Sequence, residues 1–160
     1  MSVAVDLQLA SDKIHLQATE QAFTNWADAA ISAASGPIQQ DKEVSIRIVE
    51  AEESQQLNHQ YRNKNKPTNV LSFPAEFPEG VDIPFLGDLV ICADIVEQEA
   101  KDQHKEPLAH WAHMVIHGTL HLLGYDHIND KEAEVMEDLE TQLLKMLGYP
   151  CPYTNEGDEK

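Results

Sequence analysis

Residues 113–127 read HMVIHGTLHLLGYDH, and this stretch carries the strongest structural signal in the chain. On a helix, His117 and His121 project from the same face, about 6 Å apart along the axis, because they are four residues apart. Gly124 can adopt a positive φ, end that helix and turn the chain, so that His127 returns toward the pair. The spacing H-x₃-H-x₂-G-x₂-H therefore predicts a helix, a glycine turn and three imidazoles that hold one metal ion.

Three nitrogen ligands leave a fourth position open, which is typical of a catalytic zinc rather than a structural one. Zinc is the metal we expect for three imidazoles, although nickel and copper suit the same ligands. The spacing equals that of the metzincin zinc motif H-E-x-x-H-x-x-G-x-x-H, in which the glutamate is the general base of a peptidase. Here Gly118 occupies the position of that glutamate, so ordinary peptidase activity is disfavoured.

Five of the eight histidines lie within residues 110–127, and the outer members of this cluster are candidates for supporting roles. His110 and His113 precede His117 by seven and four residues, so each could hydrogen-bond a ligand from behind or face solvent. Asp126, in the turn that follows, could orient an imidazole or accept a proton, and an exposed turn residue is the equal alternative. We therefore take His113 and Asp126 as candidate supporting residues or proton acceptors.

Hydrophobic periodicity predicts strands interrupted by helices, followed by a helical block. Alternating apolar residues predict strands at 3–9, 44–48, 69–73 and 85–92, the last with a bulge at Gly87. Helical spacing and capping signals predict helices at 19–35, 52–61, 94–104, 107–123 and 129–147. This order indicates an α+β fold with one small mixed four-stranded sheet packed with about five helices. We expect residues 1–150 to form a single domain and residues 151–160 to form a disordered tail.

Composition excludes several classes of protein. The chain has 160 residues, with 28 acidic and 11 basic side chains and a formal net charge of −17. Taken alone, this charge argues against a nucleic-acid partner, because phosphate binding depends on Lys and Arg. No run of about 18 apolar residues is present to span a membrane, and the N-terminal residues do not resemble a signal peptide. Cys92 and Cys151 are too few and too far apart for a disulfide framework or a four-cysteine zinc site. We expect a cytoplasmic protein.

The charge is unevenly distributed along the chain. Residues 54–75 contain no acidic side chain and three basic ones, Arg62, Lys64 and Lys66. Residues 128–160 contain nine acidic and three basic side chains. The guanidinium of Arg62 could bind a phosphate, while a solvated surface loop is the alternative. The net charge therefore limits the affinity for nucleic acid without excluding it as a substrate, and a divalent metal would add positive charge to its cleft.

Together with YRNKNKPTNVLSFP at 61–74 and LGDLVICADIV at 86–96, the histidine stretch resembles the bacterial YbeY endoribonuclease family. The resemblance extends from about Val44 to Tyr149 and therefore covers most of the chain. Asn65 and Asn69 stand where the family usually has aspartates. These two differences make the basic loop less acidic and leave the histidines unchanged.

The resemblance implies a zincin-like fold and a single-strand-specific, metal-dependent endoribonuclease. It implies zinc ligands at His117, His121 and His127, and an essential arginine at Arg62 that would stabilise charge on the scissile phosphate. The family acts in ribosomal RNA maturation, notably at the 3′ end of 16S rRNA, and in ribosome quality control. The expected partners are single-stranded ribosomal RNA, the small ribosomal subunit and its assembly factors, with no DNA and no membrane. The candidate RNA contacts are Arg62, Lys64 and Lys66.

Two other classes of function remain open at this stage. A non-catalytic ribosome assembly factor would use the metal structurally and the basic loop for docking. A zinc hydrolase of the peptidase-like class would need a carboxylate from elsewhere in place of the missing glutamate. For the nuclease, the attacking group is either water or the RNA 2′-hydroxyl, and Asp126 is the candidate helper for proton transfer.

Overall fold

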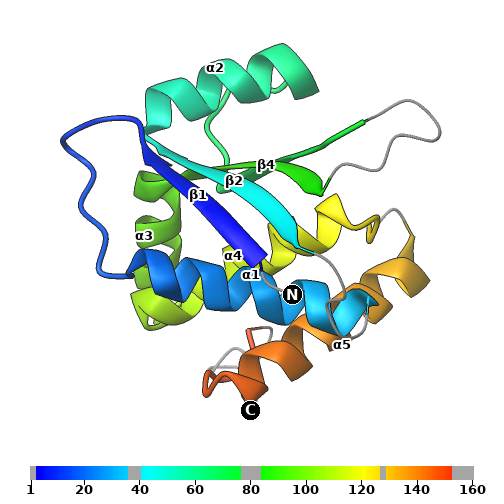
Figure 1. Ribbon diagram of the computed structural model, residues 1–160. Coiled ribbons are helices and arrows are strands. Elements are labelled where there is room, and N and C mark those ends of the chain that lie inside the picture. The colour runs from blue at the N-terminus through cyan, green and yellow to red at the C-terminus, as the bar shows by residue number, and fades with distance from the viewer. Residues whose placement is uncertain (1–2, 36–40, 77–83, 127–128, 153–160) are drawn as a thin grey trace.

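The computed structural model of this chain describes residues 3–35, 41–76, 84–126 and 129–152. Over these residues the elements follow one another in the predicted order (Figure 1). The strands are β1 (Val3–Leu9), β2 (Lys42–Val49), β3 (Val70–Pro74) and β4 (Phe85–Cys92). The helices are α1 (Glu20–Ser35), α2 (Ala51–Arg62), α3 (Ala93–Asp102), α4 (Pro107–Leu122) and α5 (Asp130–Met146). The predicted α+β class, with one mixed four-stranded sheet and about five helices, is confirmed.

The ends of the elements follow from local chemistry. Pro107 occupies the first turn of α4, where the missing N–H of proline costs nothing. The Asn129 side chain accepts a hydrogen bond of 2.9 Å from the backbone N–H of Glu132, which confirms the predicted N-cap of α5. Helix α3 ends at Asp102, two residues earlier than predicted, because His104 has a left-handed φ of 57° that no α-helix can accommodate.

The sheet has the strand order β1-β2-β4-β3, with β1, β2 and β4 parallel and β3 antiparallel at one edge. The β2–β4 register shifts where Glu43 faces Phe85 and Val44 faces Gly87, which confirms the predicted bulge in β4. Gly87 has a φ of 144°, and a Cβ at that position would collide with the carbonyl oxygen of Phe73. The bulge therefore requires glycine.

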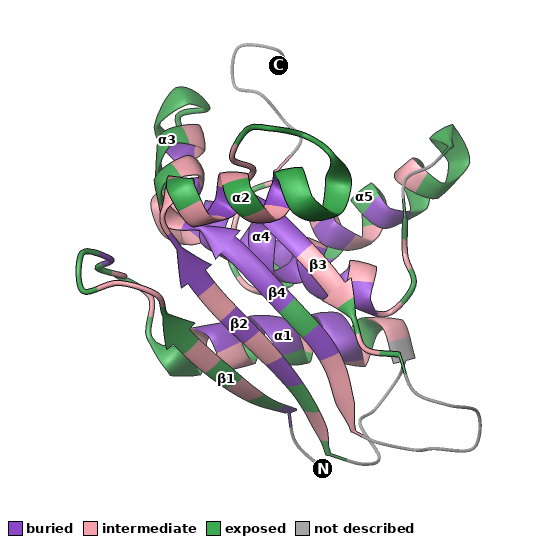
Figure 2. Cartoon of the chain, turned by 90° about the horizontal axis from the view of Figure 1, so that it is seen from above, coloured by how far each residue is buried: buried purple, intermediate pink, exposed green. Residues whose placement is uncertain are grey.

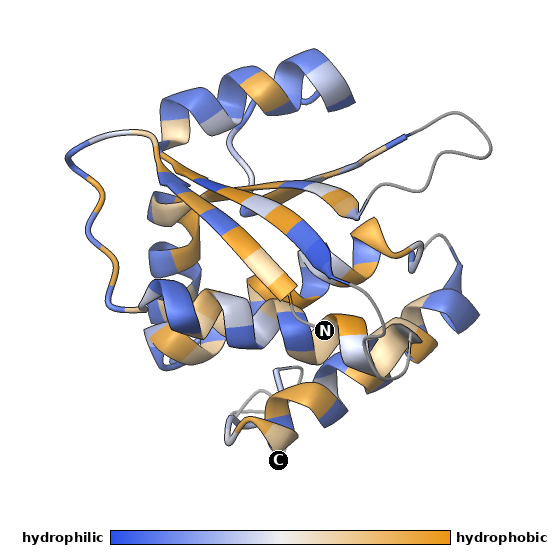
Figure 3. Ribbon diagram, in the orientation of Figure 1, coloured by the Kyte–Doolittle hydropathy of each residue, from blue (hydrophilic) through white to orange (hydrophobic). Residues whose placement is uncertain are grey.

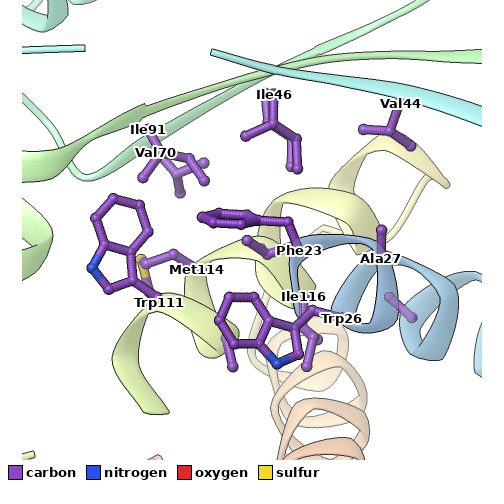
Figure 4. Close-up of a cluster of buried hydrophobic side chains, with 14 of the residues drawn as sticks. Phe23, Trp26, Ala27, Val44, Ile46, Val70, Ile91, Trp111, Met114 and Ile116 are labelled. Carbon is purple, nitrogen blue, oxygen red and sulfur yellow. The ribbon is translucent and has the colours of Figure 1, made fainter. Parts of the chain in front are cut away.

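Alternate residues of the central strands enter two apolar clusters on opposite faces of the sheet. Ile46 and Ile91 point toward α1 and α4, where they meet Phe23, Trp26 and Trp111 (Figure 4). The ring of Phe23 packs edge-to-face on both tryptophans, with centroid distances of 5.3 and 5.9 Å. The smaller cluster lies under α2 on the other face; its buried members are Val49, Leu71, Val90 and Cys92. Both faces of the sheet are therefore covered by helices (Figure 1).

Helix α4 is the buried centre of the fold, whereas α2 is largely exposed and hydrophilic (Figures 2 and 3). Gly118 lets α4 approach the sheet closely, because a Cβ there would lie 2.8 Å from Leu89 Cδ2 and 3.2 Å from Val70 Cγ2. The position at which a peptidase carries its catalytic glutamate is thus filled by the sheet in this protein. A carboxylate at position 118 would not fit this packing, which disfavours the peptidase-like alternative.

The sequence predicts that no helix spans a membrane and that residues 151–160 form a tail. Among the described helices, none combines the length and apolar character needed to cross a bilayer. Of the predicted tail at residues 151–160, residues 151 and 152 are described and Cys151 is half-buried, while the remainder lies outside the described residues.

Replacing Gly118 tests the close approach of α4 to the sheet. Gly118→Val should lower the free energy of unfolding by about 1–3 kcal/mol, because the added methyl groups overpack a buried contact with Leu89. Urea unfolding followed by circular dichroism measures the change. Glu134→Val, at an exposed position of α5, controls for the helix propensity of valine. Equal stability of Gly118→Val and the wild type would contradict the packing described here.

Candidate active site

The glycine turn after α4 fixes the orientation of His121. Gly124 has a φ of 103°, as predicted, and the chain turns back so that the N–H of Tyr125 bonds the carbonyl of Leu120 at 3.0 Å. This turn brings the carbonyl oxygen of Tyr125 to 2.9 Å from His121 Nδ1. A carbonyl oxygen can only accept, so Nδ1 carries a proton, and in the neutral ring the lone pair lies on Nε2.

A buried carboxylate fixes the orientation of His117 in the same way. Glu140 of α5 has no exposed surface and accepts from His117 Nδ1 and from His113 Nε2, each at 2.7 Å. Burial by itself would raise the pKa of Glu140, but the hydrogen bonds from the two histidines outweigh it and lower the pKa to about 2. The carboxylate is therefore ionised, and it also joins α5 to α4, which lie side by side (Figure 1).

The two remaining ring nitrogens of the histidine pair face one another. His117 Nε2 and His121 Nε2 are 3.2 Å apart, and both Nδ1 atoms already donate to fixed acceptors. In neutral imidazoles, two lone pairs then converge on one point, where a cation would satisfy both. Two tetrahedral zinc ligands with bonds of about 2.0–2.1 Å would be about 3.3 Å apart, so the separation of the two Nε2 atoms suits zinc. A ligand whose second nitrogen donates to a carboxylate or a carbonyl is the usual arrangement at protein metal sites.

A second group of side chains is also close enough to hold a metal. His113, His117 and Glu140 offer ligand atoms that all lie within 4.8 Å of one another. The group is largely buried, and the pKa of His113 is lowered, chiefly by burial. The 2.7 Å separations are those of charge-assisted hydrogen bonds, which already use both carboxylate oxygens. These contacts favour a role for Glu140 in orienting His117 rather than in binding a metal.

The histidine pair opens onto a cleft of about 640 Å³, which we call the histidine cleft. Arg62 from the end of α2 and Asp126 from the turn after α4 reach the same cleft, although their positions in the sequence are far apart. The hydroxyl of Ser72 on β3 donates to the carbonyl of Gly118 at 3.3 Å and joins the two walls. The lining residues are Tyr61, Arg62, Thr68, Asn69, Val70, Leu71, Ser72, Phe73, Pro74, His117, His121, Gly124, Tyr125 and Asp126.

The two arginines of the chain have different environments. Arg47 forms a two-pronged ion pair with Glu53, with N···O distances of 2.7 and 3.1 Å. Arg62 is exposed at the cleft, and no carboxylate pairs with it among the described residues. A guanidinium in such a position is suited to binding a phosphate.

The basic loop after α2 is held against that helix. Ser54 exchanges hydrogen bonds of 2.9 Å with the backbone of Thr68, and the Asn58 amide donates to the carbonyl of Lys66 at 2.8 Å. Both of these polar side chains of α2 are buried for this reason. Lys64 and Lys66 are exposed on this loop and do not line the histidine cleft.

The structure thus brings four of the predicted site residues to one cleft: His117, His121, Arg62 and Asp126. His113 lies behind the cleft on Glu140, and His110 bonds Glu99 at 2.9 Å on the side of α3. His127, the predicted third ligand, lies outside the described residues. Glu140 was not predicted from the sequence. A signal for it existed, because an acid interrupts the apolar stripe that Met136, Leu139 and Leu143 form on α5.

Comparison with known proteins identifies the family of this chain. An α+β fold that places two imidazoles and an arginine in one cleft has groups suited to hydrolysis of an anionic substrate. Residues 7–148 match the family described as Endoribonuclease YbeY, and the chain belongs to that family. The solution structure of TM1509 from Thermotoga maritima has the same fold, with a TM-score of 0.59 and 24% sequence identity. That comparison covers 97% of this chain and 99% of TM1509.

Replacing Glu140 tests its role in orienting His117. Gln keeps the shape of the side chain but loses the negative charge, and its NH₂ group can only donate, so it holds the two imidazole donors less strongly than the carboxylate does. Glu140→Gln should therefore weaken zinc binding by about 10- to 100-fold, measured by competition with a chromophoric chelator. Glu137→Gln, on the exposed face of the same helix, is the matched control. Unchanged zinc affinity in a folded Glu140→Gln protein would show that Glu140 does not orient a ligand.

Proposed function

We propose that this protein is a zinc-dependent endoribonuclease that cleaves single-stranded ribosomal RNA. The observation that carries the proposal is the shared histidine cleft, in which the converging Nε2 atoms of His117 and His121 lie beside an arginine without a described carboxylate partner. Membership of the YbeY family supports an RNA phosphodiester as the bond that is cleaved.

The zinc ligands in this proposal are His117, His121 and His127. Nδ1 of His117 is hydrogen-bonded to Glu140 and Nδ1 of His121 to the carbonyl of Tyr125, so Nε2 is the ring nitrogen that each would offer the metal. Zinc bound there would lower the pKa of a coordinated water to about 7 and so supply a nucleophile at neutral pH. Nickel and copper suit the same nitrogen donors and are the alternatives to zinc.

The chain's own residues supply the remaining parts of the reaction. Arg62 binds the scissile phosphate and stabilises the negative charge that develops on it during cleavage. Asp126 is exposed at the edge of the cleft and is the candidate proton acceptor, because Gly118 carries no base. The attacking oxygen belongs either to water or to the 2′-hydroxyl of the RNA. His113 acts through Glu140 and touches no substrate.

The biological role in this proposal is the processing of ribosomal RNA in the cytoplasm, including maturation of the 16S rRNA 3′ end and ribosome quality control. Lys64 and Lys66 are exposed on a loop that is fixed to α2, where they can contact RNA or the small ribosomal subunit. Because the chain carries a net charge of −17, it should bind free RNA weakly and with strong salt dependence. Delivery by the ribosomal subunit and its assembly factors would offset this weakness.

A non-catalytic assembly factor with a structural metal is the second candidate. The observation behind it is that His113, His117 and Glu140 are close enough to hold a metal in a largely buried position, where a structural ion would lie. This candidate predicts that the metal supports folding without supporting cleavage.

Substitutions in the cleft distinguish the two candidates. His117→Ala and Arg62→Glu should each reduce cleavage of an unstructured RNA by at least about 100-fold while the protein stays folded, because they remove a metal ligand and a phosphate contact. Single-turnover assays on single-stranded and duplex RNA, with circular dichroism of each variant, measure both effects.

The matched control for Arg62→Glu is Lys145→Glu, which makes the same charge change at an exposed position near the end of α5. This control should cleave RNA at close to the wild-type rate. Full activity of a folded His117→Ala protein would rule out the proposed nuclease site. Wild-type protein that binds zinc, stays folded and cleaves no RNA would favour the assembly factor.

A further inference from the structure

An exposed aromatic side chain lies at the edge of the histidine cleft. Tyr61 is 58% exposed, although large apolar side chains are usually covered. It immediately precedes Arg62 at the end of α2, and both residues line the cleft that contains His117 and His121. A large ring at this position is open to whatever the cleft binds.

The ring of Tyr61 rests on the ring of Phe73. Their centroids are 5.1 Å apart and their planes are inclined at 69°, an edge-to-face contact. In such a contact, one ring presents its edge to a face of the other, so Phe73 covers at most one face of Tyr61. Phe73 is itself partly buried against the smaller apolar cluster, which anchors the pair. Tyr61 therefore offers a flat face on a fixed support.

The segment around Tyr61 is held in place by the surrounding structure. The backbone N–H of Asn63, which has a left-handed φ of 59°, bonds the carbonyl of His59 at 3.1 Å, and the N–H of Lys64 bonds the carbonyl of Asn58 at 3.3 Å. These two bonds close the end of α2. The loop that follows is fastened to α2 through Ser54 and Asn58. Because the helix end and the loop that follows are both held by hydrogen bonds, the backbone at Tyr61 has a fixed position relative to the histidine cleft.

We propose that Tyr61, supported by Phe73, is a stacking platform for an unpaired nucleobase of the RNA substrate. This inference rests on the proposed function and specifies how the same cleft selects its substrate. A base can stack on an aromatic side chain when it is free of its own duplex, and every base has a face that can do so. Because Tyr61 and Arg62 line the same cleft, a base on Tyr61 can belong to the same strand as the phosphate that the guanidinium holds. Paired RNA cannot present a base in this way, so the platform contributes to single-strand selectivity.

The platform is tested with short single-stranded RNAs that each lack the base at one position, by measuring kcat/KM for their cleavage. With wild-type protein, one abasic position near the cleavage site should lower kcat/KM by about 5- to 150-fold, the range expected for loss of one base–aromatic stack. Tyr61→Ala should lower kcat/KM on the intact RNA by a similar factor, mainly through KM, since stacking is made in ground state and transition state alike. In Tyr61→Ala, the same abasic position should lower kcat/KM only slightly further.

Two variants complete the experiment. Tyr61→Phe keeps the ring, so an abasic position should lower its kcat/KM as much as it does in the wild type. If Tyr61 acted only through its hydroxyl, Tyr61→Phe would instead behave like Tyr61→Ala. Met146→Ala removes another exposed side chain, at the last residue of α5 and outside the histidine cleft, and should behave as wild type. If the wild type cleaves RNA and the abasic penalties are the same with and without the Tyr61 ring, the platform is refuted while the nuclease function stands. If the wild type cleaves no RNA, the proposed function fails and the platform falls with it.

Discussion

The buried carboxylate of Glu140 is the contact on which the rest of the site depends. It lies between α4 and α5, has no exposed surface, and accepts from His113 and His117 at 2.7 Å each. An ionised carboxylate in such a position is costly to desolvate, and the two imidazole donors offset that cost, as its pKa of about 2 indicates. The same contact sets the tautomer of His117, so one interaction both joins two helices and prepares a ring nitrogen for a metal.

Two glycines help to position the histidines of α4. Gly118 allows the helix to lie close against Leu89 and Val70 of the sheet. Gly124 reverses the chain, and the carbonyl of Tyr125 then holds His121. The antiparallel edge strand β3 and the end of α2 complete the cleft from the other side, so residues far apart in the sequence face one site. The catalytic proposal therefore follows from packing as much as from the histidine motif.

Much of this architecture was predictable because its signals are local. Strand alternation, the Asn129 cap, the bulge at Gly87 and the turn at Gly124 each depend on a few neighbouring residues, and all are confirmed. The contact of Glu140 with His117 was not predicted, because it joins side chains of two helices and no periodic pattern reports such a pairing. The alignment of Arg62 with the histidines likewise depends on how the sheet brings α2 and α4 together.

The most direct test of the account is a crystal structure of the zinc-loaded protein with anomalous diffraction at the zinc edge. We expect a zinc ion about 2.0–2.1 Å from Nε2 of both His117 and His121. Glu140 should keep its hydrogen bonds to His113 and to Nδ1 of His117. A zinc ion bound by Glu140 together with His113 and Nδ1 of His117 would contradict the account and would indicate a structural metal instead.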